Sequence, residues 1–150
     1  MKRLLLVRHG ESEWNATRRL QGQADIGLSP RGEAQAIALA PTIAQLAPDR
    51  VVTSDLRRAR RTAELLGYPE AMTVPGLREV DVGEWTGKEI AQLVAAEPEA
   101  YRDWRAGTFA PSGGEAWEDF VTRTTSATRT AFETADRLLV VCQGGVIRAR

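Results

Sequence analysis

The sequence predicts a three-layer α/β/α fold with a mainly parallel central sheet. Three apolar runs, at residues 4–7, 51–52 and 138–142, show no apolar/polar alternation, which is typical of strands covered on both faces. Segments with helical periodicity separate these runs, so strands and helices alternate along the chain. The chain has 150 residues, 43% of them hydrophobic, and we expect residues 1–150 to form a single domain.

The first strand is expected at residues 4–7 because this short apolar run stops at the polar, turn-forming residues 8–11. The first helix is expected over residues 30–46. Ser29-Pro30 provides its N-cap and a proline at the first helical position. We expect Pro41 to kink or interrupt this helix, because proline removes a backbone donor from the helix interior.

The second strand is expected at residues 51–52, and the helix after it runs from 56 to about 66 and ends at Gly67. Residues 73–74 form a weak extended segment, and residues 77–82 are irregular. The remaining expected elements are helices at 86–97 and 99–105, a loop at 107–114, a long helix with an apolar face from 117 to 135, a strand at 138–142 and the start of a further helix.

Composition argues against several classes of function. The chain has 20 Lys and Arg against 20 Asp and Glu, so no overall field would hold it on nucleic acid or an anionic membrane. With His9 and Cys142 as its single histidine and cysteine, the chain cannot build a disulfide framework or a Cys/His zinc site. The apolar run at residues 4–7 is too short for a signal or a membrane span, so we expect a cytoplasmic protein.

Polar, turn-rich segments follow the three predicted strands, at residues 8–11, 54–58 and 143–145. In parallel α/β folds the site lies at the carboxyl ends of the strands, where these segments meet. The neighbouring imidazole of His9 and guanidinium of Arg8 suit an anionic substrate and a nitrogen nucleophile or base. The alternative for a single histidine is a structural role at the end of a strand.

Motifs along nearly the whole chain resemble those of the histidine phosphatase superfamily, the phosphoglycerate mutase-like proteins. The most specific is Leu-Val-Arg-His-Gly-Glu-Ser-x-Trp-Asn at residues 6–15. Segments 55–66 and 77–115 are similar to small alpha-ribazole phosphate phosphatases and to broad-specificity relatives. The other matching segments, in order, are residues 21–32, S-x-x-x-R-A-x-x-T-A at 54–63, L-x-E with G-x-W-x-G at 77–87, P-S-G-G-E at 111–115, and 139–149.

The resemblance implies a phosphomonoesterase in which His9 accepts the phosphoryl group. Glu79 corresponds to the carboxylate that protonates the leaving oxygen and then deprotonates water, and Asp81 and Glu84 are its local rivals. The family needs no metal and no organic cofactor, and we expect a small phosphorylated metabolite as substrate, with a homodimer left open. The positions that correspond to phosphate or substrate contacts are Arg8, Arg58, Asn15, Gln21, Gly22 and Gly144.

The chain departs from the family pattern at Gln143, where the family has a second histidine followed by glycine. Glutamine can donate a hydrogen bond but cannot carry a charge. Two interpretations stay open: an enzyme with weakened chemistry, or a protein that binds a phospho-ligand without turnover. A mutase is a further alternative, disfavoured by the short insertion between Arg58 and the long helix. Family members usually continue beyond residue 150, so we expect the usual C-terminal elements to be missing.

Overall fold

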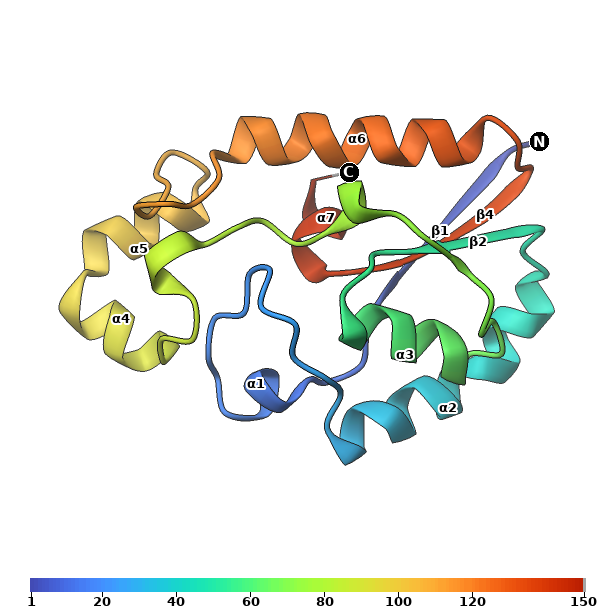
Figure 1. Cartoon of the computed structure of the whole chain (residues 1–150), viewed down its shortest axis with the longest axis horizontal. Helices are drawn as coiled ribbons and strands as arrows, with labels where there is room; N and C mark the ends of the chain where they lie inside the picture. Colours follow the sequence, from blue (N-terminus) through green and yellow to red (C-terminus); the bar gives the residue numbers. More distant parts are fainter. Residues whose placement is uncertain (150) are drawn as a thin grey trace.

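A four-stranded sheet, parallel throughout, forms the centre of the computed structural model, which describes residues 1–149 (Figure 1). Its order is β1-β4-β2-β3. Strand β4 pairs with β1 from Arg137↔Arg3 to Cys142↔Arg8, and with β2 on its other side. The predicted parallel α/β class is confirmed. The strands are β1 (Arg3–Arg8), β2 (Arg50–Thr53), β3 (Met72–Thr73) and β4 (Arg137–Cys142).

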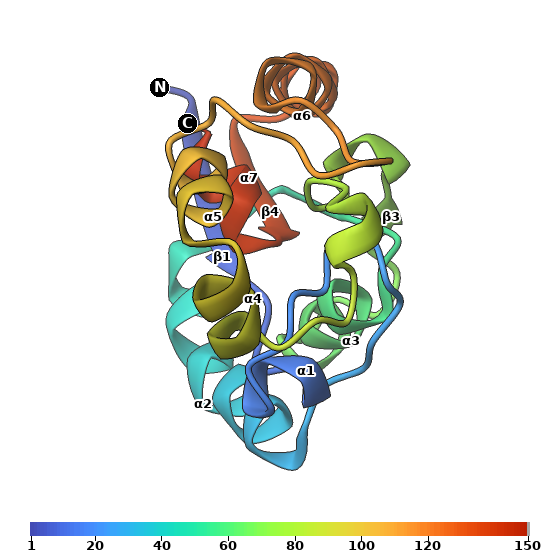
Figure 2. The same ribbon diagram turned by 90° about the vertical axis from the view of Figure 1, so that its left-hand side faces the viewer.

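Helices cover both faces of the sheet, which makes the three predicted layers. Helix α6 (Trp117–Phe132) lies along one face, and α2 (Pro30–Leu46) and α3 (Arg57–Leu65) lie along the other (Figure 2). Successive side chains of a strand point to opposite faces. Accordingly, Leu138, Val140 and Cys142 of β4 join the core beneath α6, and Leu139 and Val141 join the core beneath α2 and α3.

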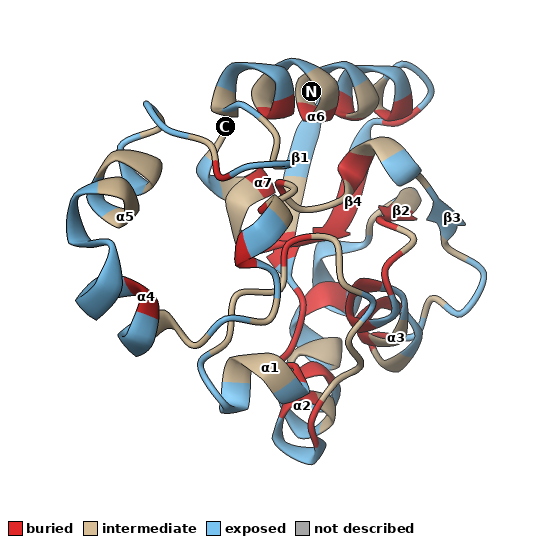
Figure 3. Cartoon of the chain, turned by 60° about the vertical axis from the view of Figure 1, so that its left-hand side comes forward, coloured by how far each residue is buried: buried red, intermediate tan, exposed pale blue. Residues whose placement is uncertain are grey.

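A two-helix arm, α4 (Ile90–Ala96) and α5 (Pro98–Arg105), extends from the sheet and is more exposed than the strands β2 and β4 (Figure 3). The arm packs on Trp85, which is fully buried. The centroid of its ring lies 6.3 Å from that of Tyr101 and 5.9 Å from that of Trp104. Trp85 belongs to the short 3-10 helix η2 (Gly83–Trp85), and another, η1 (Pro75–Leu77), follows β3. The last element is α7 (Gly144–Arg148).

Three local expectations need correction. Helix α2 continues through Pro41 without interruption, because Pro41 lies on the exposed side, where water can solvate the carbonyl that loses its donor. Helix α4 begins at Ile90 and not at residue 86, since Gly87 has a left-handed φ of 81° that a helix cannot contain. A short helix, α1 (Glu13–Ala16), was not expected. Its capping box joins Ser12 and Asn15.

None of the helices within residues 1–149 is long and apolar enough to cross a bilayer.

Candidate active site

A cavity of about 370 Å³ lies at the carboxyl edge of the sheet. Its lining includes the end of β1, the loop between β1 and α2, the amino end of α3, the segment before η2 and the start of α7. The structure therefore brings together side chains from distant parts of the chain, as the parallel topology predicts. The predicted site residues that line the cavity are Arg8, His9, Asn15, Gln21, Gly22, Arg58, Glu79 and Gly144.

His9 directly follows β1 and is 7% exposed. Its Nδ1 lies 2.6 Å from the carbonyl oxygen of Gly10. Because a carbonyl can only accept, Nδ1 carries the proton, and Nε2 keeps its lone pair. Burial lowers the pKa of His9 to about 3; the Gly10 carbonyl opposes this shift, and Arg58 and Arg8 add to it. The imidazole is therefore neutral near pH 7 and available as a nucleophile.

The loop that carries His9 is held by backbone contacts on three sides. The amide of His9 donates to the carbonyl of Cys142 in β4 at 3.0 Å. The amide of Gly10 donates to Thr62 Oγ1 at 3.1 Å, and Thr62 Oγ1 donates in turn to the Arg58 carbonyl at 2.7 Å. A Cβ added at Gly10 would collide with the backbone of Gly32 at the start of α2. The imidazole is thus placed on a rigid base.

Arg58 is the one buried arginine in the arginine-rich segment 57–61 and is 1% exposed. Its Nη1 donates to the carbonyl of Ala24 at 2.6 Å and its Nη2 to that of Gly22 at 2.7 Å. Burial lowers the pKa of Arg58 to about 10, against the opposing effect of Glu79, so the guanidinium stays charged at neutral pH. The buried face of α3 therefore carries one positive charge into the cavity.

Glu79 is the carboxylate of the cavity; its local rivals Asp81 and Glu84 do not line it. Its Oε1 accepts from the amide of Val80 at 2.9 Å, and its Oε2 accepts from the amide of Gly145 at 3.1 Å. A Cβ added at Gly145 would collide with Oε1. Glycine at this position, which the sequence did not single out, is therefore what allows the carboxylate to approach the start of α7.

Asn15 and Gln21 present amide groups to the cavity from the loop after β1. Ser12 Oγ donates to Gln21 Oε1 at 2.5 Å, and Asn15 Oδ1 accepts from the Ser12 amide at 2.9 Å. Both side-chain oxygens are therefore occupied. Within residues 1–149, no hydrogen-bond acceptor pairs with the NH₂ group of either side chain. Each NH₂ group can therefore donate to a bound anion.

Gln143 lies at the end of β4 as the N-cap of α7, and it is fully buried and does not line the cavity. Its Nε2 is 2.9 Å from Ser54 Oγ, and its Oε1 is buried without a hydrogen-bond partner. The structure thus places Gln143 directly behind Gly144 and Gly145, one residue from the cavity wall. Its side chain contacts the amino end of the α3 segment through Ser54.

The cavity holds five arginines and one glutamate in a chain of zero net charge. Besides Arg8 and Arg58 these are Arg19, Arg105 and Arg148, which sequence reasoning missed because they match no motif. Arg19 is paired with Glu89 at 3.0 Å. Within residues 1–149, Arg105 and Arg148 form no ion pair. An anion would therefore enter a strongly positive field.

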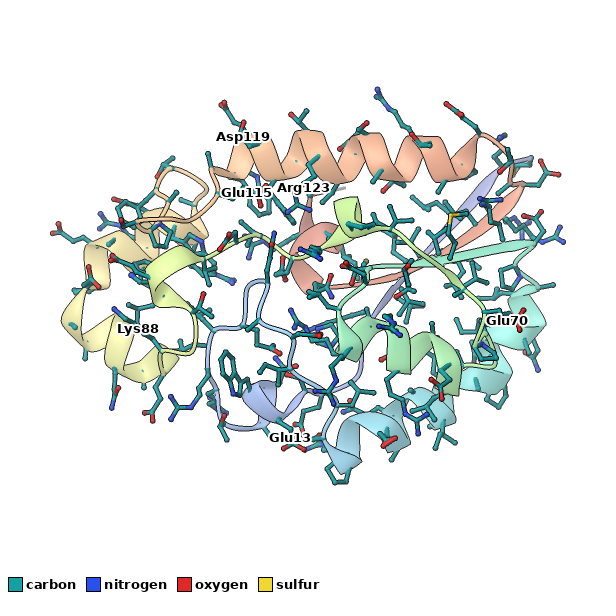
Figure 4. The ribbon with its side chains drawn as sticks, in the orientation of Figure 1. Glu13, Glu70, Lys88, Glu115, Asp119 and Arg123 are labelled. Carbon is teal, nitrogen blue, oxygen red and sulfur yellow. The ribbon has the colours of Figure 1, made fainter. Side chains whose placement is uncertain are left out.

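Two further residues lie behind the cavity and were also missed. Arg123 and Glu115, labelled in Figure 4, form an ion pair beneath α6 and contact the backbone around Glu79. The signal that could have found Arg123 is its helical spacing of three and four from Phe120 and Ala127, which puts a charge on an apolar face.

In the portion of the chain described, residues 1–149, no group of three or more His, Cys, Asp and Glu side chains is placed to hold a metal ion.

Comparison with known proteins supports the motif assignment. Residues 4–150 match the sequence model of the Histidine phosphatase superfamily (branch 1). A glucosyl-3-phosphoglycerate phosphatase of Mycolicibacterium vanbaalenii is 38% identical over 99% of this chain and 72% of its own length. For the first curated relatives, the share of their length that this chain spans runs from 56% to 72%.

Solved structures agree with the sequence relatives. The mycobacterial glucosyl-3-phosphoglycerate phosphatase in complex with VO3 has a TM-score of 0.89 and 37% identity, over 99% of this chain and 79% of that one. A candidate alpha-ribazole-5'-P phosphatase of Escherichia coli has a TM-score of 0.84 and 30% identity, over 97% of this chain and 75% of that one. Both the fold and the resemblance to the small phosphatases are confirmed.

Proposed function

Because this chain belongs to the histidine phosphatase superfamily, we propose that it hydrolyses phosphate monoesters through a phosphohistidine on His9. The observation that carries the proposal is the buried, neutral imidazole whose Nδ1 is committed to the Gly10 carbonyl. That hydrogen bond leaves Nε2 as the nucleophile in a cavity that also holds Arg8, Arg58 and Glu79. The phosphatases among the relatives, one of them solved with VO3, a group that can stand in for phosphoryl, support it.

In the first step the Nε2 lone pair of His9 attacks phosphorus, and the bond from phosphorus to the ester oxygen breaks. Glu79, in its protonated form, gives its proton to the leaving oxygen, so the products are a free alcohol, phosphohistidine and the Glu79 carboxylate. Arg8 and Arg58 neutralise the equatorial oxygens. The amide groups of Asn15 and Gln21, with the backbone of Gly22 and Gly144, bind the same oxygens.

In the second step water replaces the alcohol. The Glu79 carboxylate takes a proton from this water, whose oxygen attacks phosphorus while the bond from phosphorus to Nε2 breaks. Inorganic phosphate leaves, His9 regains its lone pair, and Glu79 is again protonated. The proposed cycle runs on water and on the side chains and backbone groups that line this cavity.

Gln143 weakens this chemistry in the proposal, since a neutral amide replaces the second imidazole of the family. Loss of one donor from a preorganised site costs about a hundredfold to a thousandfold in rate. The Gln143 amide is held by Ser54, so it is fixed, but it adds no positive charge near the phosphoryl group.

The substrate class follows from the excess of arginine in the cavity. We propose a small phosphorylated metabolite that carries negative charge beyond the phosphoryl group, because Arg105 and Arg148 have no acidic partner within residues 1–149. The mycobacterial relative is named for glucosyl-3-phosphoglycerate, a phosphoester of this kind, and its name therefore supports such a substrate. A screen of phosphoesters with and without a second anionic group tests this, and equal kcat/KM values for both kinds would contradict it.

The proposed activity is tested with p-nitrophenyl phosphate and with a ³²P-labelled phosphoester. The chain should hydrolyse the first and form an acid-labile phosphoprotein from the second, and His9→Gln should abolish both. Gln143→His should raise the rate by about a hundredfold. Gln92→His, on the exposed surface of α4, is the matched control and should change nothing. No increase in Gln143→His would contradict the assignment of position 143.

The second candidate is a phospho-ligand-binding protein with negligible turnover, and the observation that favours it is Gln143. It predicts micromolar binding of inorganic phosphate without hydrolysis of any phosphoester.

The same screen distinguishes a phosphatase from a mutase. A mutase would transfer phosphate between the hydroxyl groups of phosphoglycerate and not to water.

A further inference from the structure

We infer that Arg123 and Glu115 form a positioning pair that holds Glu79 in the cavity that it shares with His9. The inference rests on the proposed function, in which Glu79 is the acid and base. Neither Arg123 nor Glu115 lines the cavity, so the pair acts through Glu79 and not through the substrate. Figure 4 shows both side chains below α6, on the side of the Glu79 segment.

The segment that carries Glu79 has no regular structure of its own. Residues 78–82 lie between η1 and η2 and form neither a helix nor a strand. A carboxylate on such a segment can be placed accurately only if other parts of the molecule fix its backbone. Acid–base catalysis depends on this placement, because proton transfer requires hydrogen-bond reach to the reacting oxygen.

Arg123 binds two carbonyl groups of this segment, and one of the preceding η1, with one guanidinium. Its Nη1 donates to the carbonyl oxygens of Gly76 and Arg78, both at 3.0 Å, and its Nη2 donates to that of Glu79 at 3.2 Å. Hydrogen bonds from a charged donor are about twice as strong as neutral ones. The planar fork of the guanidinium also fixes the direction of each bond.

Glu115 holds the guanidinium and the far end of the segment. Its Oε2 accepts from Arg123 Nε at 2.9 Å, and its Oε1 accepts from Arg123 Nη2 at 2.7 Å. Its backbone amide donates to the carbonyl of Asp81 at 2.9 Å. The two side chains are only 25% and 17% exposed, so water competes weakly for these bonds. The pair thus ties backbone groups from Gly76 to Asp81 to α6.

The kinetic test uses two phosphoesters that differ in their need for an acid. Glycerol 2-phosphate has a poor leaving group, whereas 2,4-dinitrophenyl phosphate releases a stable phenolate without protonation. Arg123→Met should lower kcat/KM for glycerol 2-phosphate by at least about tenfold and leave that for the dinitrophenyl ester within about twofold. Arg123→Lys, which keeps the charge but not the fork, should fall between. Arg129→Met, on the exposed surface of α6, is the matched control.

A general loss of structure would lower both kcat/KM values equally, and that result would overturn the inference. Glu79→Gln supplies a second check, because adding Arg123→Met to it should cost nothing further with glycerol 2-phosphate. Additive effects of the two changes would also contradict a role that runs through Glu79. Where Arg123→Met does not fold, Glu115→Gln takes its place and should give the same pattern with a smaller loss.

Hydrogen exchange tests the inference without any turnover. The amides of Val80 and Gly145 donate to the Glu79 carboxylate, so they report its position. In Arg123→Met both should exchange at least about tenfold faster, and the amide of Leu139 in β4 should be unchanged. Unchanged exchange at Val80 and Gly145 would refute the positioning pair. If the wild-type chain hydrolyses neither ester, the proposed function fails, and the exchange result still decides this inference.

Discussion

The burial of His9 should make the stability of this protein depend on pH in a range where few other groups titrate. The pKa of His9 is about 3 in the folded chain, against 6.5 for the exposed imidazole of the unfolded chain. Above pH 6.5 the imidazole is neutral in both the folded and the unfolded states. As the pH falls below 6.5, only the unfolded chain takes up the proton, so the free energy of unfolding decreases until the pH reaches about 3.

The size of the effect follows from the shift. Each pH unit within this range costs about 1.4 kcal/mol, so lowering the pH from 7.5 to 5 should cost about 2 kcal/mol through His9 alone. Because the chain contains no other histidine, the variant His9→Gln removes this contribution completely. Arg78 donates hydrogen bonds to the carboxylate of Asp55 and lowers its pKa. Titration of Asp55 therefore affects the free energy of unfolding only at lower pH.

Urea denaturation of both proteins at pH 7.5 and pH 5 measures the difference. The wild-type protein should lose about 2 kcal/mol more than His9→Gln between the two pH values. Equal losses would mean that the folded chain protonates His9 as readily as the unfolded chain does, and the argument for a neutral nucleophile would fail.

Three further changes test the packing around the site. Gly145→Ala should lower the rate of phosphoester hydrolysis by at least about tenfold, because its Cβ would displace the Glu79 carboxylate, and circular dichroism should show an intact fold. Thr62→Val leaves the Gly10 amide without an acceptor and should cost about 1–3 kcal/mol in urea denaturation; no change would contradict the role of that bond. Ser29→Ala removes the N-cap of α2 and should cost about 1 kcal/mol in urea denaturation; an unchanged free energy of unfolding would contradict the role of this cap.

The elements that sequence reasoning predicted well are those whose signals are local. The apolar run at residues 138–142 predicted a buried strand, and β4 is the central strand that β1 and β2 flank. The motif at residues 54–63 selected Arg58, and this is the arginine that lies on the buried face of α3 with Ala59 and Ala63. Burial periodicity and a specific motif together were sufficient for these positions.

The features that sequence reasoning missed depend on contacts between distant segments. Gly145 matters because Glu79, far away in the chain, approaches it, and no local pattern shows this. Arg123 reads as one more charged residue of α6 until the carbonyl groups of residues 76–79 are seen around it. The late start of α4, in contrast, has a local cause, which is the left-handed φ of Gly87.

The central place of β4 also has a consequence for biosynthesis. Residues 137–142 are made after β1, β2 and β3, yet they insert between β1 and β2, and the amide of His9 donates to the carbonyl of Cys142. A growing chain that has only β1, β2 and β3 outside the ribosome therefore lacks the neighbour that fixes its nucleophile. Long-range pairing of this kind forms slowly, because much of the chain must be ordered to close it. Catalytic competence should thus appear only after β4 has paired with β1 and β2.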